Sequence, residues 1–250
     1  MATWNPETYL KFDAPRLRPA LDLIGQVHLK NPRTIVDLGC GPGNVTQILK
    51  ERWPDADVTG IDSSPHMLEK AKAAYPDVSW QQADVSTWKP DGPVDLIYSN
   101  ACLHWLEDHE GLFTRLFSYL SYDGVLAVQM PSNFAAPTHQ LIRDVLGKGH
   151  PLSPGFPVHA PQEYYDWLAS EAMHLNLWET TYQHILEGDN PVADWTKGAA
   201  LRPVLDDLTD DQARKEFETD YRARIAKAYP KSGNGKTVMP FKRFFLIAQK

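Results

Sequence analysis

The sequence predicts an α/β fold built on a mostly parallel β-sheet, and three observations carry that prediction. Between residues 34 and 130, short β-branched apolar segments alternate with segments whose apolar residues recur at helical spacing. A turn with three glycines in five positions, at residues 39–43, directly follows the first apolar segment. The segments between the apolar runs are long enough to form helices, and helical crossovers join strands that run parallel.

Five segments of this region are expected to be strands. They are Thr34–Leu38, Asp57–Ile61, Val78–Gln82, Val94–Ser99 and Val125–Met130. A helix is expected over Asn44–Trp53, and the next one opens with Ser64 as its N-cap and Pro65 at its first position. Its buried stripe is expected to comprise Met67, Leu68, Ala71 and Tyr75.

A third helix of this region has its apolar residues on one face. They are Leu112, Phe113, Leu116, Phe117 and Leu120, and Gly124 is expected to end the helix. Beyond residue 131 the expected helices are Thr138–Leu146, Pro161–Ser170 and Asp210–Ala228, and the expected strands are Leu175–Ile185 and Phe244–Ala248. Residues 187–236 form a helical insertion between these last strands, which is long for a connection. It is interpreted as a lid or a substrate subdomain, with a stabilising decoration as the alternative.

Composition excludes several classes of protein. The formal net charge is −7 and no dense Lys/Arg cluster occurs, which argues against a nucleic-acid partner. The two cysteines, Cys40 and Cys102, show no spacing typical of disulfides or of a metal site. No apolar run reaches the roughly 20 residues of a membrane span, and the first residues do not read as a secretory signal. We therefore expect a soluble cytoplasmic protein without a membrane partner.

The glycine turn predicts a nucleotide-like ligand. Unpaired N–H groups open the following helix, and such sites lie at the carboxyl ends of parallel strands. The dinucleotide fingerprint G-x-G-x-x-G fails at Asn44, which disfavours an NAD-dependent dehydrogenase. The carboxylate of Asp37 is a poor neighbour for pyrophosphate but suits an ammonium group. S-adenosylmethionine, with its amino-acid end, sulfonium and adenosine, has such a group and no phosphate.

Two further acids follow the next strands. Asp62 ends the second strand and can accept both ribose hydroxyls, and Asp84 follows the third and can accept the adenine amino group. Each acid alone is more often a cap or a solvated loop residue. The ordered trio of Asp37, Asp62 and Asp84 behind a G-x-G-x-G turn is much more specific.

Four motifs resemble those of the class I S-adenosylmethionine-dependent methyltransferases: VDLGCGPGN, GIDSSPHML, QADV and DLIYSNACLHWL. The resemblance implies a three-layer, Rossmann-like, seven-stranded sheet whose last strand is antiparallel. It also implies a set of cofactor contacts. These are Asp37, Gly39, Cys40, Gly41, Gly43, Asp62, Ser63, Met67, Asp84, Val85, Asn100 and Ala101.

Segments outside this core resemble the trans-aconitate methyltransferases within that family. They are WNPETYLKFDAPRLRPA, LAVQMPSNFAAPTHQLIR, VHAPQEYYDWL, DWTKGAALRPVLDDL and MPFKRFFLIAQK. The resemblance implies esterification of one carboxylate of trans-aconitate to a monomethyl ester. Ala199 and Ala200 depart from it, because a Thr-Gly pair is expected there, and this bears on the local backbone and on substrate fit.

Methylation of a carboxylate requires no general base, because a group with a pKa of about 4 is already ionised at neutral pH. No catalytic acid–base pair and no metal are therefore expected. The outer carboxylates of a tricarboxylate need cationic partners, best supplied by arginine. The candidates for orienting the substrate are His104, Arg202, Gln129, Tyr9, Arg16 and Arg243. A structural role for His104 and a surface role for each arginine are the alternatives.

The expected organisation is a single domain over residues 1–250. Residues 1–30 cover the cleft, 31–131 bind the cofactor, and 132–250 form the C-terminal half with the lid insertion at 187–236. A monomer is expected. The alternative functions are a carboxyl methyltransferase for another small or carrier-bound acid, such as a malonyl thioester, and a non-catalytic S-adenosylmethionine-binding protein. A carrier protein would need a basic docking patch, which the sequence does not show.

Overall fold

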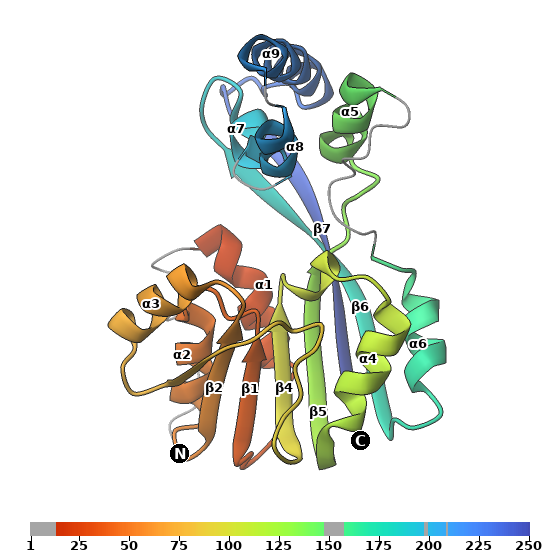
Figure 1. The fold of residues 1–250 in the computed structure, drawn as a ribbon. Helices are drawn as coiled ribbons and strands as arrows, with labels where there is room; N and C mark the ends of the chain where they lie inside the picture. Colours follow the sequence, from red (N-terminus) through yellow and green to blue (C-terminus); the bar gives the residue numbers. More distant parts are fainter. Residues whose placement is uncertain (1–13, 148–157, 198–199, 209) are drawn as a thin grey trace. The chain divides into compact units, whose positions relative to one another are not determined.

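The structure is a computed structural model and describes residues 14–147, 158–197, 200–208 and 210–250 (Figure 1). These residues fall into two compact units. Unit 1 holds the described residues up to Met130, together with His159–Glu179 and Phe244–Lys250. Unit 2 holds those of Pro131–Val158 and Thr180–Arg243.

Seven strands form one sheet in the order β3-β2-β1-β4-β5-β7-β6. Their bounds are β1 Thr34–Leu38, β2 Asp57–Asp62, β3 Ser79–Gln82, β4 Val94–Asn100, β5 Leu120–Pro131, β6 His174–Leu186 and β7 Thr237–Gln249. The strands from β3 to β5 pair in parallel, so that Asp37 of β1 lies between Gly60 of β2 and Tyr98 of β4. The strand order therefore switches between β1 and β4, because β2 and β3 follow on one side of β1 and β4 lies on its other side.

The last strand runs antiparallel to its neighbour. The Lys250 N–H donates to the Gly124 carbonyl, whereas the Ser132 N–H donates to the Lys242 carbonyl, so residue numbers rise along β5 as they fall along β7. These bonds confirm the expected seven-stranded, mostly parallel sheet with an antiparallel last strand. β7 begins well before the expected Phe244.

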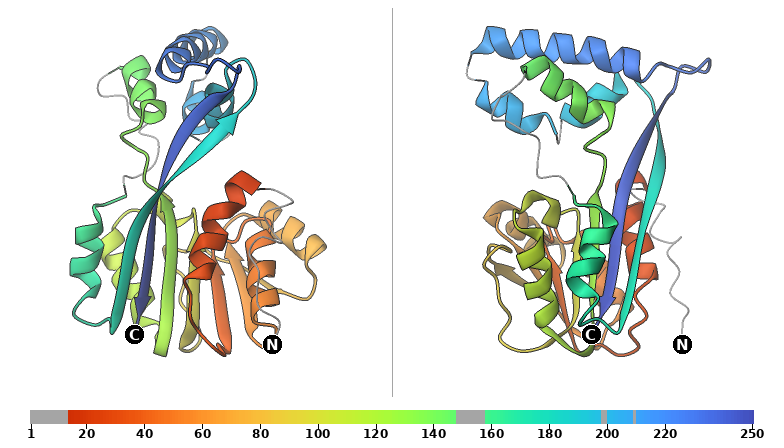
Figure 2. Two further views of the ribbon diagram at one scale, coloured as in Figure 1. Left: turned by 180° about the vertical axis from the view of Figure 1, so that it is seen from behind. Right: turned by 90° about the vertical axis from the view of Figure 1, so that its right-hand side faces the viewer.

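Helices cover both faces of the sheet in unit 1. α1 (Ala14–Gly25) packs with α2 (Asn44–Arg52), and α4 (His109–Ser118) packs with α6 (Pro161–Leu168). The right-hand view of Figure 2 shows α1 on one side of the sheet and α4 with α6 on the other. The buried apolar faces of these helices and of the strands between them make the expected three layers.

α3 (Pro65–Ala74) begins as the sequence predicts. The Ser64 hydroxyl accepts a hydrogen bond from the Met67 N–H at 3.3 Å, and Pro65 is the first helical residue. The expectation that Met67 is buried is wrong, because its side chain is 37% exposed while Leu68 and Ala71 are buried. At about 100° per residue, Met67 lies at the edge of the stripe that Leu68 and Ala71 define.

The expected end of the third helix is also wrong. α4 ends at Ser118, and both Leu120 and Gly124 belong to β5. Leu120 pairs with Val94, after which an irregularity shifts the register. Gly124 serves close strand packing rather than helix termination, because a Cβ there would stand 3.0 Å from the Val94 carbonyl oxygen.

Unit 2 has a hydrophobic cluster of its own. Its helices are α5 (Pro137–Leu146), α7 (Pro191–Lys197), α8 (Arg202–Asp207) and α9 (Asp211–Ala228). Ile142 of α5 and Val192 of α7 pack with Phe217, Tyr221 and Ile225 of α9. The last three confirm most of the apolar side expected for this long helix, since Ala213 is only half-buried.

Candidate functional site

Two positions of the turn after β1 require glycine. Gly39 and Gly43 have φ angles of 75° and 86°, in the left-handed region that disfavours other residues. A Cβ on Gly39 would stand 2.3 Å from the Cys102 Sγ, and one on Gly43 would stand 2.4 Å from the Trp80 ring. Glycine is therefore required at both positions by the close packing of Cys102 and Trp80 against the turn.

Asp37 is a buried carboxyl group just before this turn. It is 2% exposed, and the Thr46 hydroxyl of α2 donates to its Oδ2 at 2.6 Å. Burial raises the pKa of Asp37 from its ordinary value to about 7, the Thr46 hydrogen bond opposes that rise, and the neighbouring charge of Asp62 adds to it. A cation placed beside Asp37 would favour the ionised form.

Asp62 ties the glycine turn to the loop after β2. Its Oδ2 accepts from the Gly41 N–H at 2.9 Å and its Oδ1 accepts from the Ser64 N–H at 2.8 Å. Each carboxylate oxygen has a second lone pair, so the half-buried group keeps capacity to accept further hydrogen bonds.

The loop after β3 is organised around Asp84. The Ser86 N–H and hydroxyl both donate to its Oδ1, at 2.8 and 2.7 Å, and these bonds hold the pKa of the exposed carboxyl below its ordinary value. Arg115 of α4 donates to the carbonyls of Val85 and Trp88, at 3.3 and 3.1 Å. The loop is thus fixed at both ends, and the Oδ2 of Asp84 takes no part in the bonds to Ser86.

β4 ends in an unusual backbone. Ala101 has a φ of 54°, and its N–H donates to the Gln129 carbonyl at 2.9 Å. The preceding Asn100 has a buried Oδ1 that finds no hydrogen-bond partner in the described part of the chain.

Both cysteines lie at this end of the sheet as free thiols. Burial is the main cause that raises the pKa of Cys102 to about 12, and it raises the pKa of Cys40 further. The nearby carboxyls Asp37 and Asp62 act in the same direction. The thiols therefore stay protonated at neutral pH.

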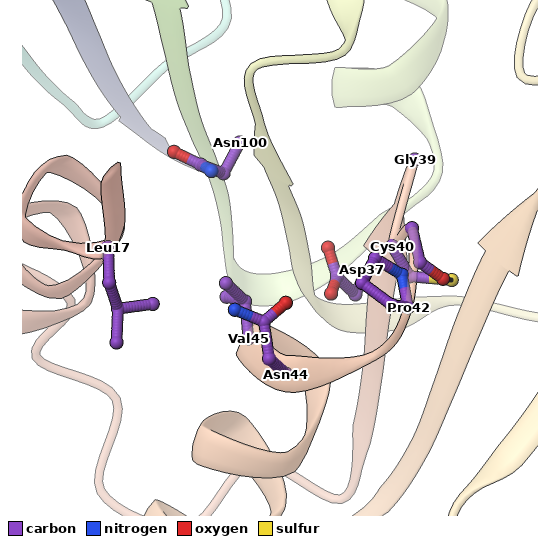
Figure 3. A pocket seen from close by; sticks show the side chains of 9 residues that line it. Leu17, Asp37, Gly39, Cys40, Pro42, Asn44, Val45 and Asn100 are labelled. Atoms are coloured by element: carbon purple, nitrogen blue, oxygen red, sulfur yellow. Dashed lines mark hydrogen bonds between the residues drawn. The ribbon is translucent and has the colours of Figure 1, made fainter. Parts of the chain in front are cut away.

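A cavity of about 200 Å³ opens beside the glycine turn in unit 1 (Figure 3). It is lined by Leu17, Asp37, Gly39, Cys40, Gly41, Pro42, Asn44, Val45 and Asn100. It brings together five residues expected to contact the cofactor: Asp37, Gly39, Cys40, Gly41 and Asn100. The others do not line it and lie on the turn, at the end of β2, in the loops that follow β2, β3 and β4, or in the first turn of α3; they are Gly43, Asp62, Ser63, Met67, Asp84, Val85 and Ala101.

Sequence reasoning missed four lining residues. Pro42 stands between two predicted glycines, and Asn44 and Val45 open the helix whose N–H groups were expected to face a ligand. These three could have been included on that ground. Leu17 comes from α1, and no sequence signal tells which residues of that helix reach the end of the sheet.

The structure describes three of the six candidates for orienting the substrate at the level of side chains. His104 is buried in the short 3₁₀ helix η2 (Leu103–Trp105), against the Trp105 ring, and Gln129 is fully buried in β5. Both belong to unit 1. Arg243 belongs to unit 2, is 9% exposed and forms no ion pair with a described residue, and burial lowers its pKa to about 10.

The other three candidates are Tyr9, Arg16 and Arg202. Tyr9 lies outside the described residues, and the side chains of Arg16 in α1 and Arg202 in α8 do as well. Across the described ranges, no cluster of three His, Cys, Asp or Glu side chains is arranged to hold a metal ion. No helix in those ranges has the length and apolar character of a membrane span.

Comparisons with known proteins find a matching family model for part of the chain and relatives that match nearly all of it. A family model described as a methyltransferase domain matches residues 35–124. The trans-aconitate 2-methyltransferase of Klebsiella pneumoniae (strain 342) is 45% identical, covering 100% of this chain and 99% of the relative. The protein of that name from Azoarcus sp. (strain BH72) is 44% identical, covering 99% of each. Among solved structures, the YcgJ protein of Bacillus subtilis superposes with a TM-score of 0.61 at 15% identity, covering 93% of this chain and 98% of that one, a likeness of fold.

Proposed function

The chain belongs to the trans-aconitate 2-methyltransferase family, and from this premise we propose that it transfers the methyl group of S-adenosylmethionine to one carboxylate of trans-aconitate. The product is a monomethyl ester. The observation that carries the proposal is the identity of 45% and 44% over essentially the full length of two relatives, which includes the segments outside the cofactor-binding core.

The residues of unit 1 fit S-adenosylmethionine. Asp37 offers a buried carboxyl to the ammonium group, and the Asn100 Oδ1 has no partner among the described residues. The backbone of Gly41 is open to a ligand, because a Cβ there would meet nothing within 4 Å, whereas Cys102 and Trp80 fill the space beside Gly39 and Gly43. When bound, the cofactor supplies a methyl group on a positively charged sulfur.

The remaining predicted contacts with the cofactor are proposed as follows. Asp62 is proposed to accept the ribose hydroxyls with its spare lone pairs, and Asp84 to accept the adenine amino group with its Oδ2. Further proposed contacts with the cofactor are Cys40, Gly41, Ser63, Met67, Val85 and Ala101.

The protein has to bind the substrate, orient it and remove water from its reacting carboxylate. The reacting carboxylate is ionised at neutral pH, so no side chain has to remove a proton. Holding the reacting oxygen in line with the methyl carbon supplies much of the rate enhancement. His104 and Gln129 are proposed to orient the substrate. Tyr9, Arg16, Arg202 and Arg243 are proposed for its other carboxylates, which arginine would bind in pairs of hydrogen bonds.

A panel of di- and tricarboxylic acids and a malonyl thioester, each incubated with radiolabelled methyl donor, tests the proposal. We expect labelled ester chiefly from trans-aconitate. Label found mainly on another acid would favour the alternative carboxyl methyltransferase. Tight cofactor binding with no ester from any acid would favour a non-catalytic binding protein.

We also propose that the enzyme is a cytoplasmic monomer that acts on a free small molecule. Free thiols at Cys40 and Cys102 suit a reducing compartment. Light scattering coupled to size exclusion tests the monomer, and fractionation of the source cells tests the compartment.

A further inference from the structure

Three buried polar atoms of unit 1 gather on neighbouring strands without a hydrogen-bond partner among the described residues. They are the Oδ1 of Asn100 and the Nε2 and Oε1 of Gln129, whose side chain is 0% exposed. Buried polar atoms are nearly always paired, and an unpaired one destabilises the fold. Two orphan atoms on a single glutamine therefore indicate a group that the described chain does not supply.

The sheet sets the two side chains next to each other. Asn100 of β4 and Gln129 of β5 are partners in the parallel register, and the Ala101 N–H donates to the Gln129 carbonyl. Residues paired in register point to the same face of a sheet. Because Asn100 lines the cavity beside the glycine turn, the carboxamide of Gln129 lies on the same face, one strand further from that turn.

We propose that Gln129 donates its amide N–H to the carboxylate that is methylated and so selects the reacting oxygen, an inference that rests on the proposed function. In this reaction an oxygen lone pair forms the O–C bond while the C–S bond breaks and its electrons stay on sulfur. No proton moves, and the carboxylate loses its charge.

A neutral donor suits this change of charge better than an arginine does. A guanidinium would bind the charged carboxylate more strongly than the transition state, in which that charge is being lost, and such binding slows the chemical step. An amide orients the oxygen with a weaker hold on its charge. The structure thus assigns the reacting carboxylate to a glutamine and leaves the arginines to the others.

Gln129→Met, which keeps the shape and removes both polar atoms, tests this assignment. Titration of trans-aconitate into enzyme saturated with S-adenosylhomocysteine should show binding weakened about tenfold or more. The affinity for S-adenosylhomocysteine itself should be unchanged.

The melting temperature of Gln129→Met should rise, because two unpaired buried atoms are removed. A residue needed only for folding would lower it. Gln129→Glu, of equal size but negative, should weaken trans-aconitate binding further.

Gln249→Met, at the half-buried C-terminal end of β7, is the matched control and should change neither affinity. The inference is overturned if Gln129→Met binds trans-aconitate as the wild type does, or if it weakens both ligands equally. A lower melting temperature together with unchanged substrate binding would assign Gln129 to the fold. If the wild type itself fails to bind or methylate trans-aconitate, the proposed function fails instead.

Discussion

Asp37 is the residue on which recognition of a cationic cofactor most depends. Its pKa of about 7 in the free protein means that only part of the population is ionised at neutral pH. A bound ammonium group favours the carboxylate, so cofactor binding should release a proton. Affinity for S-adenosylmethionine should therefore fall by up to about tenfold per pH unit below pH 7 and level off above it. Calorimetry between pH 5.5 and 8.5, in buffers of different ionisation enthalpy, measures both affinity and proton release. A flat profile without proton release would contradict this role.

The same carboxyl links stability to pH. Its pKa is raised on folding, so the folded state holds a proton that the unfolded state loses between about pH 4 and pH 7. Its stabilising contribution is complete below pH 4 and is lost as the pH rises to 7. Asp37→Asn, which cannot ionise, should melt above the wild type at pH 8, by at least about 2 °C, and lose that advantage near pH 4. It should also bind S-adenosylmethionine poorly. A variant less stable at pH 8 would refute the burial argument.

Thr46 adjusts the acidity of Asp37 through a single hydrogen bond of 2.6 Å. Thr46→Val keeps the shape but removes the hydroxyl, so the pKa of Asp37 should rise further. The midpoint of the affinity profile should then move to higher pH. Thr46→Ser keeps the hydroxyl and serves as the control. Equal midpoints in all three proteins would show that the bond has no such effect.

At the scale of elements, α4 holds the loop that carries Asp84. Arg115 reaches from that helix to the Val85 and Trp88 carbonyls. Arg115→Met should loosen the loop and weaken binding of S-adenosylhomocysteine more than binding of its deaminated inosine analogue, because only the former has the amino group that Asp84 is proposed to accept. Arg214→Met removes a comparable pair of bonds to the Leu205 and Leu208 carbonyls in unit 2. That control should leave both affinities unchanged, and equal losses for both ligands with Arg115→Met would contradict the assignment.

Elements with one strong local signal could be predicted from the sequence. Elements whose type depends on pairing with a segment distant in sequence could not. Thr34–Leu38 is a strand because its apolar run ends in a glycine turn, and Ser64 with Pro65 marks a helix start. The start of β5 was missed because Leu120 continues the apolar spacing of α4, while Gly124 looks like a helix stop. Only the pairing with Val94, a contact distant in sequence, makes this stretch a strand.

The candidate site divides in the same way. The acids and glycines could be found because they stand at strand ends, where parallel topology brings them together. The unpaired amide of Gln129 could not be predicted, because the sequence does not tell which neighbours come within hydrogen-bond distance of a buried side chain. Leu17 likewise enters the cavity only through the packing of α1.

At the scale of the whole molecule, the cavity beside the glycine turn is lined by residues of unit 1, whereas unit 2 has a cluster of its own. The sequence did not reveal that α5 joins α9, because spacing along the chain does not say that Ile142 meets Phe217 and Ile225. Such long-range pairings decide which segments share a core.

A buried residue of unit 2 tests whether the cofactor site is independent of that core. Ile225 is 0% exposed, so Ile225→Ala should cost about 2–5 kcal/mol of stability in chemical denaturation. Affinity for S-adenosylmethionine, measured where the variant is still folded, should be unchanged. A parallel loss of cofactor affinity would show that unit 2 supports the site.

Methyl transfer is tested most simply by mass spectrometry of trans-aconitate after incubation with the purified protein and S-adenosylmethionine labelled with ¹³C in its methyl group. The wild type should give a monomethyl ester that carries the label, and Asp37→Asn should give much less of it under the same conditions. Unchanged trans-aconitate, with the methyl donor bound but intact, would contradict it.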